Sequence, residues 1–377
     1  MTEPLSKIPG GMRYYFGGET RLRRAVENEV MAIFDGWGYE EIATPLVDYY
    51  ALFEKGMGRE EAQRAFRFTD TDGRMLALRP DVTSAVARAA ATLFSERKRP
   101  LRFSYAASVF RQRPRSHAEW KRQTRHLGCE LIGAGKGTAD VEVLVVAAEI
   151  LERLGLRSRY RITLNHAGIL RGVAEELRLD ETERERLRHL IDIRDAAGLE
   201  AMLASRAGAS RSAVSLALRL GRLTGRRGAL GEAREFAEGE RALEGFRALA
   251  EIWEVVEALD LAGSFEIDLG DVSGMDYYTG LVFRVYVEGA GARVGSGGRY
   301  DELATNFGRR ETAVGFVLDL DALAELIGRD AGSVFAHGSG REVMKVEGDG
   351  ARELFLEARR RRAAGERVEL GAGGERC

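Results

Sequence analysis

Residues 265–303 constrain the fold more than any other stretch, because two strand patterns flank a cluster of glycines there. Apolar and polar residues alternate in 265–269, which is typical of a half-buried strand. The run 282–287 is rich in β-branched and aromatic residues and predicts a second strand. The segment 295–301 predicts a glycine-rich turn that ends in an Arg–Asp charge pair.

Two adjacent tyrosines, Tyr277 and Tyr278, follow Asp276 between these two strands, with Gly274 and Gly280 on either side. Tyrosine rings can stack on a small polar ligand while their hydroxyls hydrogen-bond to it. The glycines allow the backbone to come close to a bound molecule. The stretch fits two β-hairpins around a tyrosine-rich core equally well.

The composition is that of an ordinary globular protein. The chain has 377 residues, of which 45% are hydrophobic and 31% charged, enough for two or three domains. A net charge of −2 gives no general affinity for nucleic acids or anionic membranes. Two cysteines, Cys129 and Cys377, make no disulfide framework, and no Cys/His cluster has zinc spacing. We therefore expect no metal, a cytoplasmic location, and neither a signal peptide nor a membrane span.

The first part of the chain alternates helix and strand patterns. Apolar residues recur at helical spacing in 19–35, and glycines at 36 and 38 end this helix. A long amphipathic helix followed by a strand that ends in proline can build a subunit interface, or it can be a plain αβ unit. The remaining patterns predict a strand at 39–44, a hairpin at 64–79, a helix from 83 to about 94, strands at 102–111 and 122–133, a helix at 138–154 and a strand at 159–164.

Residues 168–260 are helical in pattern and contain no proline, with breaks expected near Gly198, Gly221 and Gly239. Because strand-rich segments flank them, they predict a helical domain inserted in an α+β fold. We expect a core at 1–167, the insertion at 168–260, a second core part at 261–328 and a C-terminal remnant at 329–377. In the remnant, 331–340 is rich in Gly and Ser and is expected to be mobile, 342–370 predicts a strand–helix–strand unit, and the last residues are expected to be disordered.

Two sets of charged residues are candidates for ligand binding. Arg111 ends one predicted strand and Glu130 lies on its antiparallel neighbour, so they can hold opposite ends of a zwitterion or form a cross-strand salt bridge. Pro80, Asp81 and Thr83 open a predicted helix. Capping of that helix explains their residue types by itself.

Several motifs resemble the catalytic core of histidyl-tRNA synthetase, a class II aminoacyl-tRNA synthetase, over about residues 6–323. The motifs are GYEEIATPLVD at 38–48, LRPDVT at 78–83, SVFRQRP at 108–114, TRHLGCELIG at 124–133, SGMDYYTGLVF at 273–283 and GGRYDEL at 297–303. The resemblance implies an α+β fold with an antiparallel sheet flanked by helices. It also implies that the motif at 38–48 contributes to a dimer interface.

The resemblance also implies a histidine-binding site. Asp81 and Thr83 would take the ammonium group, Arg111 the carboxylate and Glu130 an imidazole nitrogen, while Tyr278 would close the pocket. The family usually has glutamate at Asp81 and glutamine at His126, so these two positions depart from it. The expected histidine-binding residues are Asp81, Thr83, Arg111, His126, Glu130, Tyr277 and Tyr278.

Other departures argue against amino-acid activation. Ser273 and Ala322 stand where the family has arginines that contact ATP, and serine cannot supply a fixed bidentate charge. Asp319 and Asp321 are acidic where phosphate would have to sit, so we expect both to repel ATP. The segment 324–377 is also too short for the anticodon-binding domain of the synthetases.

A synthetase core with these departures is similar to the regulatory subunits of ATP phosphoribosyltransferase. That resemblance implies a non-catalytic chain without a cofactor, required by a short-form catalytic subunit in the first step of histidine biosynthesis. It further implies a dimerising chain, a hetero-octamer of four regulatory and four catalytic chains, and histidine as allosteric effector, with no tRNA and no membrane as partners. The alternatives are a divergent histidyl-tRNA synthetase and a synthetase-like module that senses histidine or uncharged tRNA.

Overall fold

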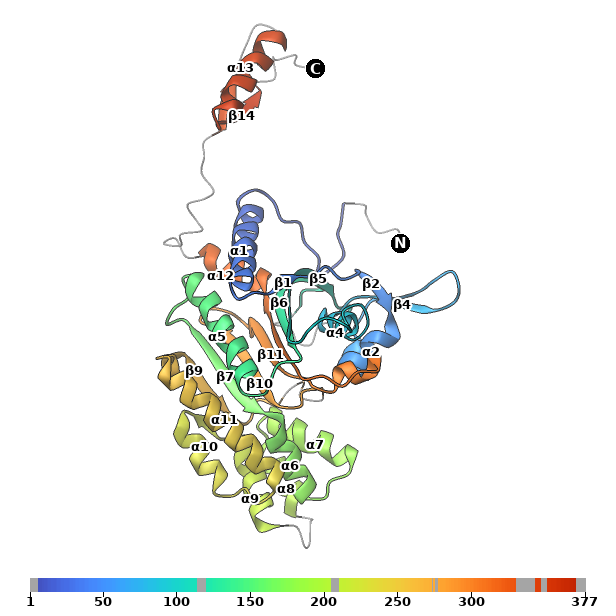
Figure 1. Cartoon of the computed structure of the whole chain (residues 1–377), viewed down its shortest axis with the longest axis vertical. Coiled ribbons are helices and arrows are strands. Elements are labelled where there is room, and N and C mark those ends of the chain that lie inside the picture. Colours follow the sequence, from blue (N-terminus) through green and yellow to red (C-terminus); the bar gives the residue numbers. More distant parts are fainter. Residues whose placement is uncertain are drawn as a thin grey trace.

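The computed structural model describes residues 6–113, 120–204, 210–272, 274, 277–329, 343–346 and 351–370 (Figure 1). At its centre lies a nine-stranded sheet in the order β1-β5-β6-β12-β11-β10-β7-β9-β8. The strands are β1 (Glu40–Glu41), β5 (Leu101–Phe110), β6 (Gln123–Ile132), β7 (Tyr160–His166), β8 (Thr224–Gly225), β9 (Phe265–Asp268), β10 (Leu281–Val287), β11 (Gly295–Arg299) and β12 (Ala313–Asp319).

The six strands from β5 to β7 in the sheet are antiparallel to their neighbours, whereas β1 pairs with β5, and β9 with β7, in parallel. This arrangement confirms the expected α+β class with a mainly antiparallel sheet. The two long central strands β5 and β6 match the predicted pair closely. The first strand is shorter than the predicted 39–44, since only two of its residues pair with β5.

The sheet corrects two predictions for residues 265–303. Strands β9 and β10 form no hairpin, because β7 lies between them and pairs with both. The segment 295–301 is not simply a turn, because Gly295–Arg299 is strand β11 inside the sheet. Its glycines are needed for packing: a Cβ on Gly297 would lie 2.5 Å from Phe283, Phe316 and the Gly315 carbonyl oxygen. The expected Arg299–Asp301 pair is present at 3.0 Å.

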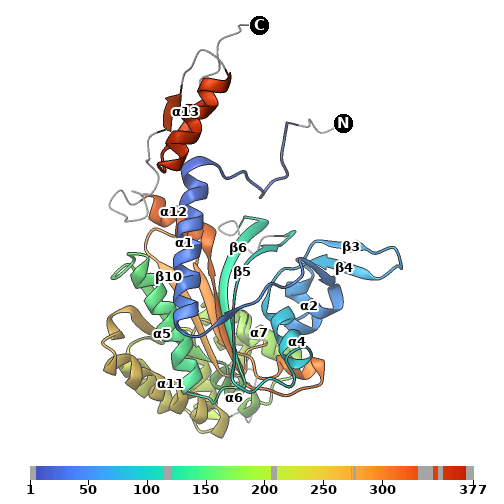
Figure 2. The same cartoon turned by 45° about the horizontal axis from the view of Figure 1, so that its top comes forward.

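Helices α1 (Gly17–Gly36) and α5 (Thr138–Arg153) cover one face of the sheet, as Figure 2 shows. The Phe34 ring of α1 lies 5.9 Å from that of Phe316 on β12, within one hydrophobic core that also contains residues of α5. Helix α12 (Leu320–Arg329) follows β12 and packs against α1. The face under α1, α5 and α12 is therefore packed into the main hydrophobic core.

The opposite face carries a smaller layer. Helix α4 (Thr83–Ala91) packs over β5 through Val86, Ala90 and Phe103, and it ends three residues before the predicted end at 94. Around it lie α2 (Tyr50–Met57), α3 (Arg59–Ala62), the 3₁₀ helix Leu303–Phe307 and a second sheet in the order β2-β4-β3. In that sheet β3 (Arg67–Thr69) and β4 (Met75–Leu78) form the predicted hairpin, and β2 (Val47–Tyr49) joins it.

Residues 168–260 are mainly helices joined by turns, with the short β8 among them and 205–209 outside the described residues, and they lie at one end of the sheet (Figure 1). The helices are α6 (Ala167–Glu176), α7 (Glu181–Asp192), α8 (Ala196–Ala204), α9 (Arg211–Leu220), α10 (Arg227–Arg234) and α11 (Glu240–Ala258), followed by the 3₁₀ helix Ala262–Ser264. Breaks occur at Gly221 and Gly239 as predicted. The break predicted near Gly198 lies at 193–195, between α7 and α8, and Gly198 itself is in the first turn of α8, where its N–H donates to Asp195.

A separate β-α-β unit near the C-terminus matches the strand–helix–strand prediction. It consists of β13 (Val343–Val346), α13 (Ala351–Ala363) and β14 (Arg367–Leu370), with the two strands parallel. The predicted mobile segment 331–340 and the last residues lie outside the described residues. No helix in the described part of the chain is long and apolar enough to cross a membrane. The domain limits at 168, 260 and 328 stay predictions.

We predict that Gly297→Ala lowers the free energy of unfolding by about 1–3 kcal/mol, because overpacking of a tight interior forces its neighbours to move. Gly291→Ala is the matched control, since nothing lies within 4 Å of a Cβ built on this exposed glycine in the same hairpin. Urea titrations of the two variants and the wild type measure the difference. Equal stability of the two variants would contradict the close packing of β11.

Candidate functional site

A cavity of about 150 Å³ lies on the face of the main sheet that carries α4, beneath α4 and the segment with Tyr277 and Tyr278. We call it the smaller cavity. All seven residues of the expected histidine site line it: Asp81, Thr83, Arg111, His126, Glu130, Tyr277 and Tyr278. The predicted set is therefore one spatial cluster, contributed by the start of α4 and the residues before it, the residue after β5, strand β6 and the segment before β10.

Residues that pair across adjacent strands of the sheet form rows, and two of these rows make the floor of the cavity. One row crosses four adjacent strands and ends in a charged side chain: Gly128, Val317, Ser296 and Arg284. The next row on the same face holds one carboxylate, two glycines and a valine: Glu130, Gly315, Gly298 and Val282. The glycines make room, since a Cβ on Gly315 would overlap the Glu130 carboxylate.

Glu130 is 1% exposed, yet three hydroxyl groups hold its carboxylate. Thr83 donates to Oε1 at 2.7 Å, Tyr105 donates to Oε1 at 3.2 Å, and Tyr300 donates to Oε2 in a short hydrogen bond. Burial raises the pKa of Glu130 to about 7, although these hydrogen bonds oppose the rise. A buried carboxylate with this pKa is stabilised when it takes up a proton. A cationic group or an N–H donor of a ligand stabilises it in the same way.

Asp81 is the second buried carboxylate of the cavity. Burial raises its pKa to about 6, against the effects of the Ser84 hydroxyl and the Arg111 guanidinium. Ser84 donates to Oδ2 at 3.2 Å, whereas Oδ1 is buried without a hydrogen-bond partner. The capping explanation is wrong for Asp81, because α4 begins without a side-chain cap hydrogen bond. The Ser84 hydroxyl accounts for one oxygen of Asp81, and the other is left to a ligand. Thr83, the other candidate cap, donates to Glu130 instead.

Arg111 immediately follows β5, and its guanidinium donates to the carbonyl oxygen of Pro80 at 3.1 Å. The register places Glu130 opposite Phe103, at the far end of the strand pair from Arg111. The two are therefore not cross-strand neighbours, and they meet across the cavity instead. A cation and a carboxylate separated in this way suit the two ends of a zwitterion.

Aromatic side chains complete the smaller cavity. The rings of Tyr277 and Tyr278 lie 4.2 Å apart, and Tyr278 is 5% exposed. Tyr300 lies 6.0 Å from Tyr277. Sequence analysis missed Tyr105 and Tyr300 as site residues; Tyr300 belongs to the GGRYDEL motif, which pointed to its neighbourhood but not to its role. Ser273 and Asp276 lie outside the described residues.

His126 on β6 lies between the smaller cavity and a larger one. Burial and the positive charges of Arg111 and Arg79 hold the pKa of His126 well below its usual value, so its ring is neutral. Its Nε2 lies 3.3 Å from the Thr124 hydroxyl. At this position a neutral ring adds hydrogen-bonding capacity to the site without adding charge.

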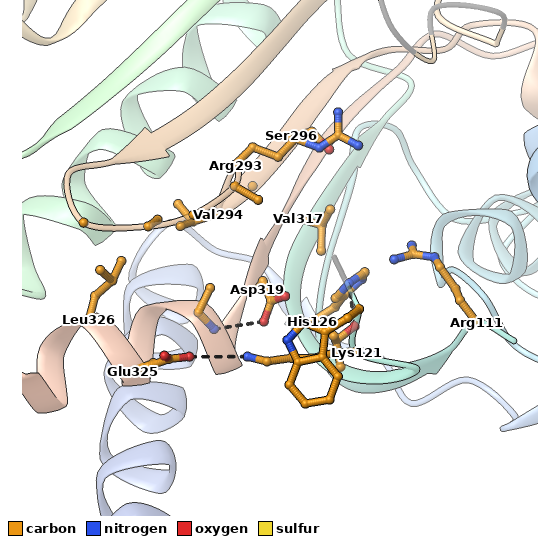
Figure 3. Close-up of a pocket in the computed structure, with 18 of the residues that line it drawn as sticks. Arg111, Lys121, His126, Arg293, Val294, Ser296, Val317, Asp319, Glu325 and Leu326 are labelled. Atoms are coloured by element: carbon orange, nitrogen blue, oxygen red, sulfur yellow. Dashed lines mark hydrogen bonds and ion pairs between the residues drawn. The ribbon is translucent and has the colours of Figure 1, made fainter. Parts of the chain in front are cut away.

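The larger cavity, of about 310 Å³, adjoins the smaller one (Figure 3). The two share six lining residues: Arg64, Arg111, His126, Arg293, Ser296 and Val317. Figure 3 shows the Arg111 guanidinium and the His126 ring projecting into the space opposite Arg293 and Ser296. On its far side, Lys121 forms an ion pair with Glu325 at 3.6 Å.

The first turn of α12 forms one wall of the larger cavity. Ala322 lines the cavity, and Asp319 accepts hydrogen bonds from the N–H groups of Asp321 and Ala322 at 2.8 and 3.1 Å. The expectation for Asp321 was wrong: its side chain is buried in an ion pair with Arg23 and accepts from the Arg125 N–H at 3.1 Å. Asp321 therefore belongs to the α1–α12 contact, and only Asp319 faces the cavity.

The chain has relatives among known proteins in both sequence and fold. Residues 11–323 match the family model of histidyl-tRNA synthetase. A protein of Moorella thermoacetica named ATP phosphoribosyltransferase regulatory subunit is 34% identical over 97% of this chain and 92% of its own length. A histidine–tRNA ligase of Methanocaldococcus jannaschii is 35% identical over 84% of this chain and 74% of its own.

A solved structure from Bacillus halodurans, titled an ATP phosphoribosyltransferase regulatory subunit/histidyl-tRNA synthetase, superposes with a TM-score of 0.85 at 29% identity. The superposition covers 99% of this chain and 95% of that one. The shared fold thus covers nearly all of both chains.

We predict that the protein becomes less stable as the pH rises, because of the titration of Glu130. Because folding raises the pKa of this carboxyl from 4.5 to about 7, the folded state binds more protons than the unfolded state between these pH values. The free energy of unfolding should therefore fall as pH rises through this window, by roughly 3 kcal/mol for this group. Glu130→Gln should lack this contribution, as urea titrations at a series of pH values can show.

Glu96→Gln is the matched control, because Glu96 is exposed and lies outside both cavities. Its stability should follow the wild type at every pH. A Glu130→Gln variant with the same pH dependence as the wild type would show that the buried carboxyl titrates normally.

Proposed function

The chain belongs to the histidyl-tRNA synthetase family, and we propose that within this family it is a non-catalytic, histidine-binding regulatory subunit of ATP phosphoribosyltransferase. Identity alone does not separate this function from that of a tRNA ligase, since the two kinds of relative are 34% and 35% identical to the chain. Coverage does not separate them either, since relatives named regulatory subunit match between 84% and 97% of the chain and the ligase matches 84%.

The observation that carries the proposal is the first turn of α12. The N–H groups at a helix start are a natural place for a phosphate, but the Asp319 carboxylate already accepts two of them. Ala322 beside it has no charge to offer, where the family resemblance calls for an arginine. Transfer of a nucleotide phosphate needs fixed positive groups around the developing charge, so this wall is unsuited to adenylate formation.

The smaller cavity fits a free amino acid with a basic ring. The unpartnered oxygen of Asp81 can accept from an ammonium group, and Arg111 can bind a carboxylate. Glu130 can accept from an imidazole N–H, which would return its proton to solvent and lower its pKa. The ammonium, carboxylate and imidazole groups of histidine thus each have a partner of suitable charge in the cavity.

In the proposed complex, histidine acts as an effector through its different affinity for two states of the assembly. We place a short-form catalytic subunit as the partner, in a hetero-octamer of four chains of each kind built on dimers of this chain. The name of the M. thermoacetica relative supports the catalytic partner, since a regulatory subunit requires one.

We predict that free histidine binds to the purified chain, and that Arg111→Met and Glu130→Gln each weaken binding by at least about 10-fold. The physical reason is the loss of a hydrogen bond to a charged group, worth on the order of 1.5–3 kcal/mol. Isothermal titration calorimetry at pH 8, above the raised pKa values of both carboxyls, measures the affinity. Absence of binding by the wild type, with and without the catalytic subunit, would rule out the site.

Arg97→Met and Glu96→Gln provide matched controls for these substitutions. Both residues are exposed, and Arg97 forms its ion pair with Glu40 at the surface. The two controls should bind histidine as the wild type does. A loss of affinity in the controls would point to a general effect of charge rather than to the cavity.

We predict that the chain co-purifies with a short-form ATP phosphoribosyltransferase, raises its activity and makes it sensitive to histidine. Glu130→Gln should retain activation and lose most of the histidine sensitivity. The same preparations should give no histidine-dependent exchange of pyrophosphate into ATP, with the M. jannaschii ligase as a positive control. Clear exchange would instead establish the chain as a tRNA ligase.

A further inference from the structure

The β-α-β unit of β13, α13 and β14 takes no part in either cavity (Figure 1). Its two strands form a separate parallel sheet, so each strand has one unpaired edge within the described residues. Parallel sheets are normally covered on both faces, and a two-stranded sheet is only marginally stable by itself. A further strand at one of these edges would therefore stabilise the unit.

The apolar face of this small sheet is only partly covered. The register places Met344 beside Val368, and Val346 beside Leu370, on the same face. Val346 and Ala358 of α13 are the buried residues of the described unit, and α13 contacts both strands, so α13 lies over this face. Met344 and Leu370 nevertheless stay 41% and 37% exposed. The unit thus leaves apolar surface in water beside its helix.

The opposite face of the sheet is charged, and its charges alternate in sign. Lys345 of β13 lies beside Glu369 of β14, and Arg367 precedes Glu369 by two residues on the same face. The open edge of β14 therefore presents Arg367, Val368 and Glu369 in succession. If two such edges pair antiparallel with Val368 at the centre, each Arg367 lies directly opposite a Glu369 of the other strand. The edge is complementary in charge to a second copy of itself.

Other ways of pairing the unit with itself lack this complementarity. A pairing of β14 centred on Glu369 would place two carboxylates opposite each other, which destabilises a sheet. A pairing of β13 centred on Met344 would place Val343 opposite Lys345 and form no ion pair. A pairing of β13 centred on Lys345 would oppose two ammonium groups. The charges thus favour one edge and one register.

We propose that β14 pairs antiparallel with β14 of a second copy of this chain, with Val368 at the two-fold axis, so that two C-terminal units form one four-stranded sheet. Met344 and Val368 of both copies then make an apolar row across all four strands. On the charged face, Lys345 and Glu369 of one copy continue into Arg367 of the other. A guanidinium has five N–H donors, so Arg367 can bind this carboxylate and keep its contacts within its own copy.

The helices fit the same arrangement. The strand order β13-β14-β14-β13 puts both α13 helices on one face of the sheet. Neighbouring strands lie about 4.8 Å apart, so the middles of the two β13–β14 pairs are roughly 10 Å apart. Two helices pack at about this distance. The second helix therefore lies where it can cover apolar surface that the first leaves exposed.

The contact goes beyond the proposed function and does not depend on histidine binding. In the proposed assembly, which contains four copies of this chain, pairing through β14 would join one dimer to another. Two different two-fold contacts on each chain can close into a tetramer.

Charge reversal at the edge of β14 tests the register. Glu369→Arg and Arg367→Glu each place like charges opposite each other, so each should weaken self-association by about 10-fold or more and halve the mass of the wild-type assembly. An equimolar mixture of the two variants should regain the wild-type mass, because the acidic strand of one then lies opposite the basic strand of the other. Sedimentation velocity of the wild type, both variants and the mixture measures these masses.

Glu353→Arg and Arg352→Glu are the matched controls, because they change the charge equally at exposed positions of α13 in the same unit. Both should keep the wild-type mass. A loss of mass in these controls would show that the unit responds to charge in general, which would contradict pairing through β14.

A cross-link gives a second measurement of the register. Val368→Cys, in a Cys377→Ser background, should form a disulfide between copies on mild oxidation, because residues opposite each other in an antiparallel pair lie within reach of a disulfide. The remaining Cys129 is buried. Val343→Cys on the outer strand β13 is the control and should stay unlinked.

Equal masses of the wild type and Glu369→Arg would overturn the inference, as would a mixture of the two variants that stays at half the mass. A Glu369→Arg variant that keeps its mass but no longer co-purifies with the catalytic subunit would assign the edge to that subunit instead. Histidine binding should be the same in all these variants. A wild-type protein that self-associates through β14 but binds no histidine would refute the proposed function and leave this inference standing.

Discussion

The buried carboxylate of Glu130 is the constraint on which the cavity depends. A carboxylate that is 1% exposed is tolerable only when its oxygens are satisfied, and the hydroxyls of Thr83, Tyr105 and Tyr300 satisfy them. These three groups come from α4, β5 and the end of β11, so Glu130 joins the two layers of the core. Gly315 beside it on β12 leaves the space that the carboxylate occupies.

The two cavities share a wall but differ in what they can bind. The smaller one offers two carboxyls with raised pKa values and the Arg111 guanidinium, a set suited to an amino acid. In the larger one, the start of α12 is capped internally by Asp319, and Asp321 is used to fix α12 to α1. In the proposed function, this member of the histidyl-tRNA synthetase family binds an amino acid in the smaller cavity, while the adjoining wall stabilises the start of α12.

Much of the fold could be predicted from local pattern. The long helix at 17–36, the strand pair 101–110 and 123–132 and the hairpin at 67–78 follow from periodicity, because their apolar faces repeat with the period of the element. The errors occurred where packing overrode composition. Residues 295–299 look like a turn, yet they form a strand that pairs with β10 and β12, where Gly297 leaves room for Phe283 and Phe316.

The sequence by itself determined which residue types form the site, since Asp81, Thr83, Arg111, Glu130 and the tyrosine pair stand in motifs that are recognisable in order. Only the tertiary structure decided how they are used. The strand register placed Arg111 and Glu130 across a cavity rather than side by side, brought Tyr105 and Tyr300 to the same carboxylate, and put Arg284 on the cavity floor. These relations join residues far apart in the chain, and no local pattern encodes the pairing of strands or the burial of a charge.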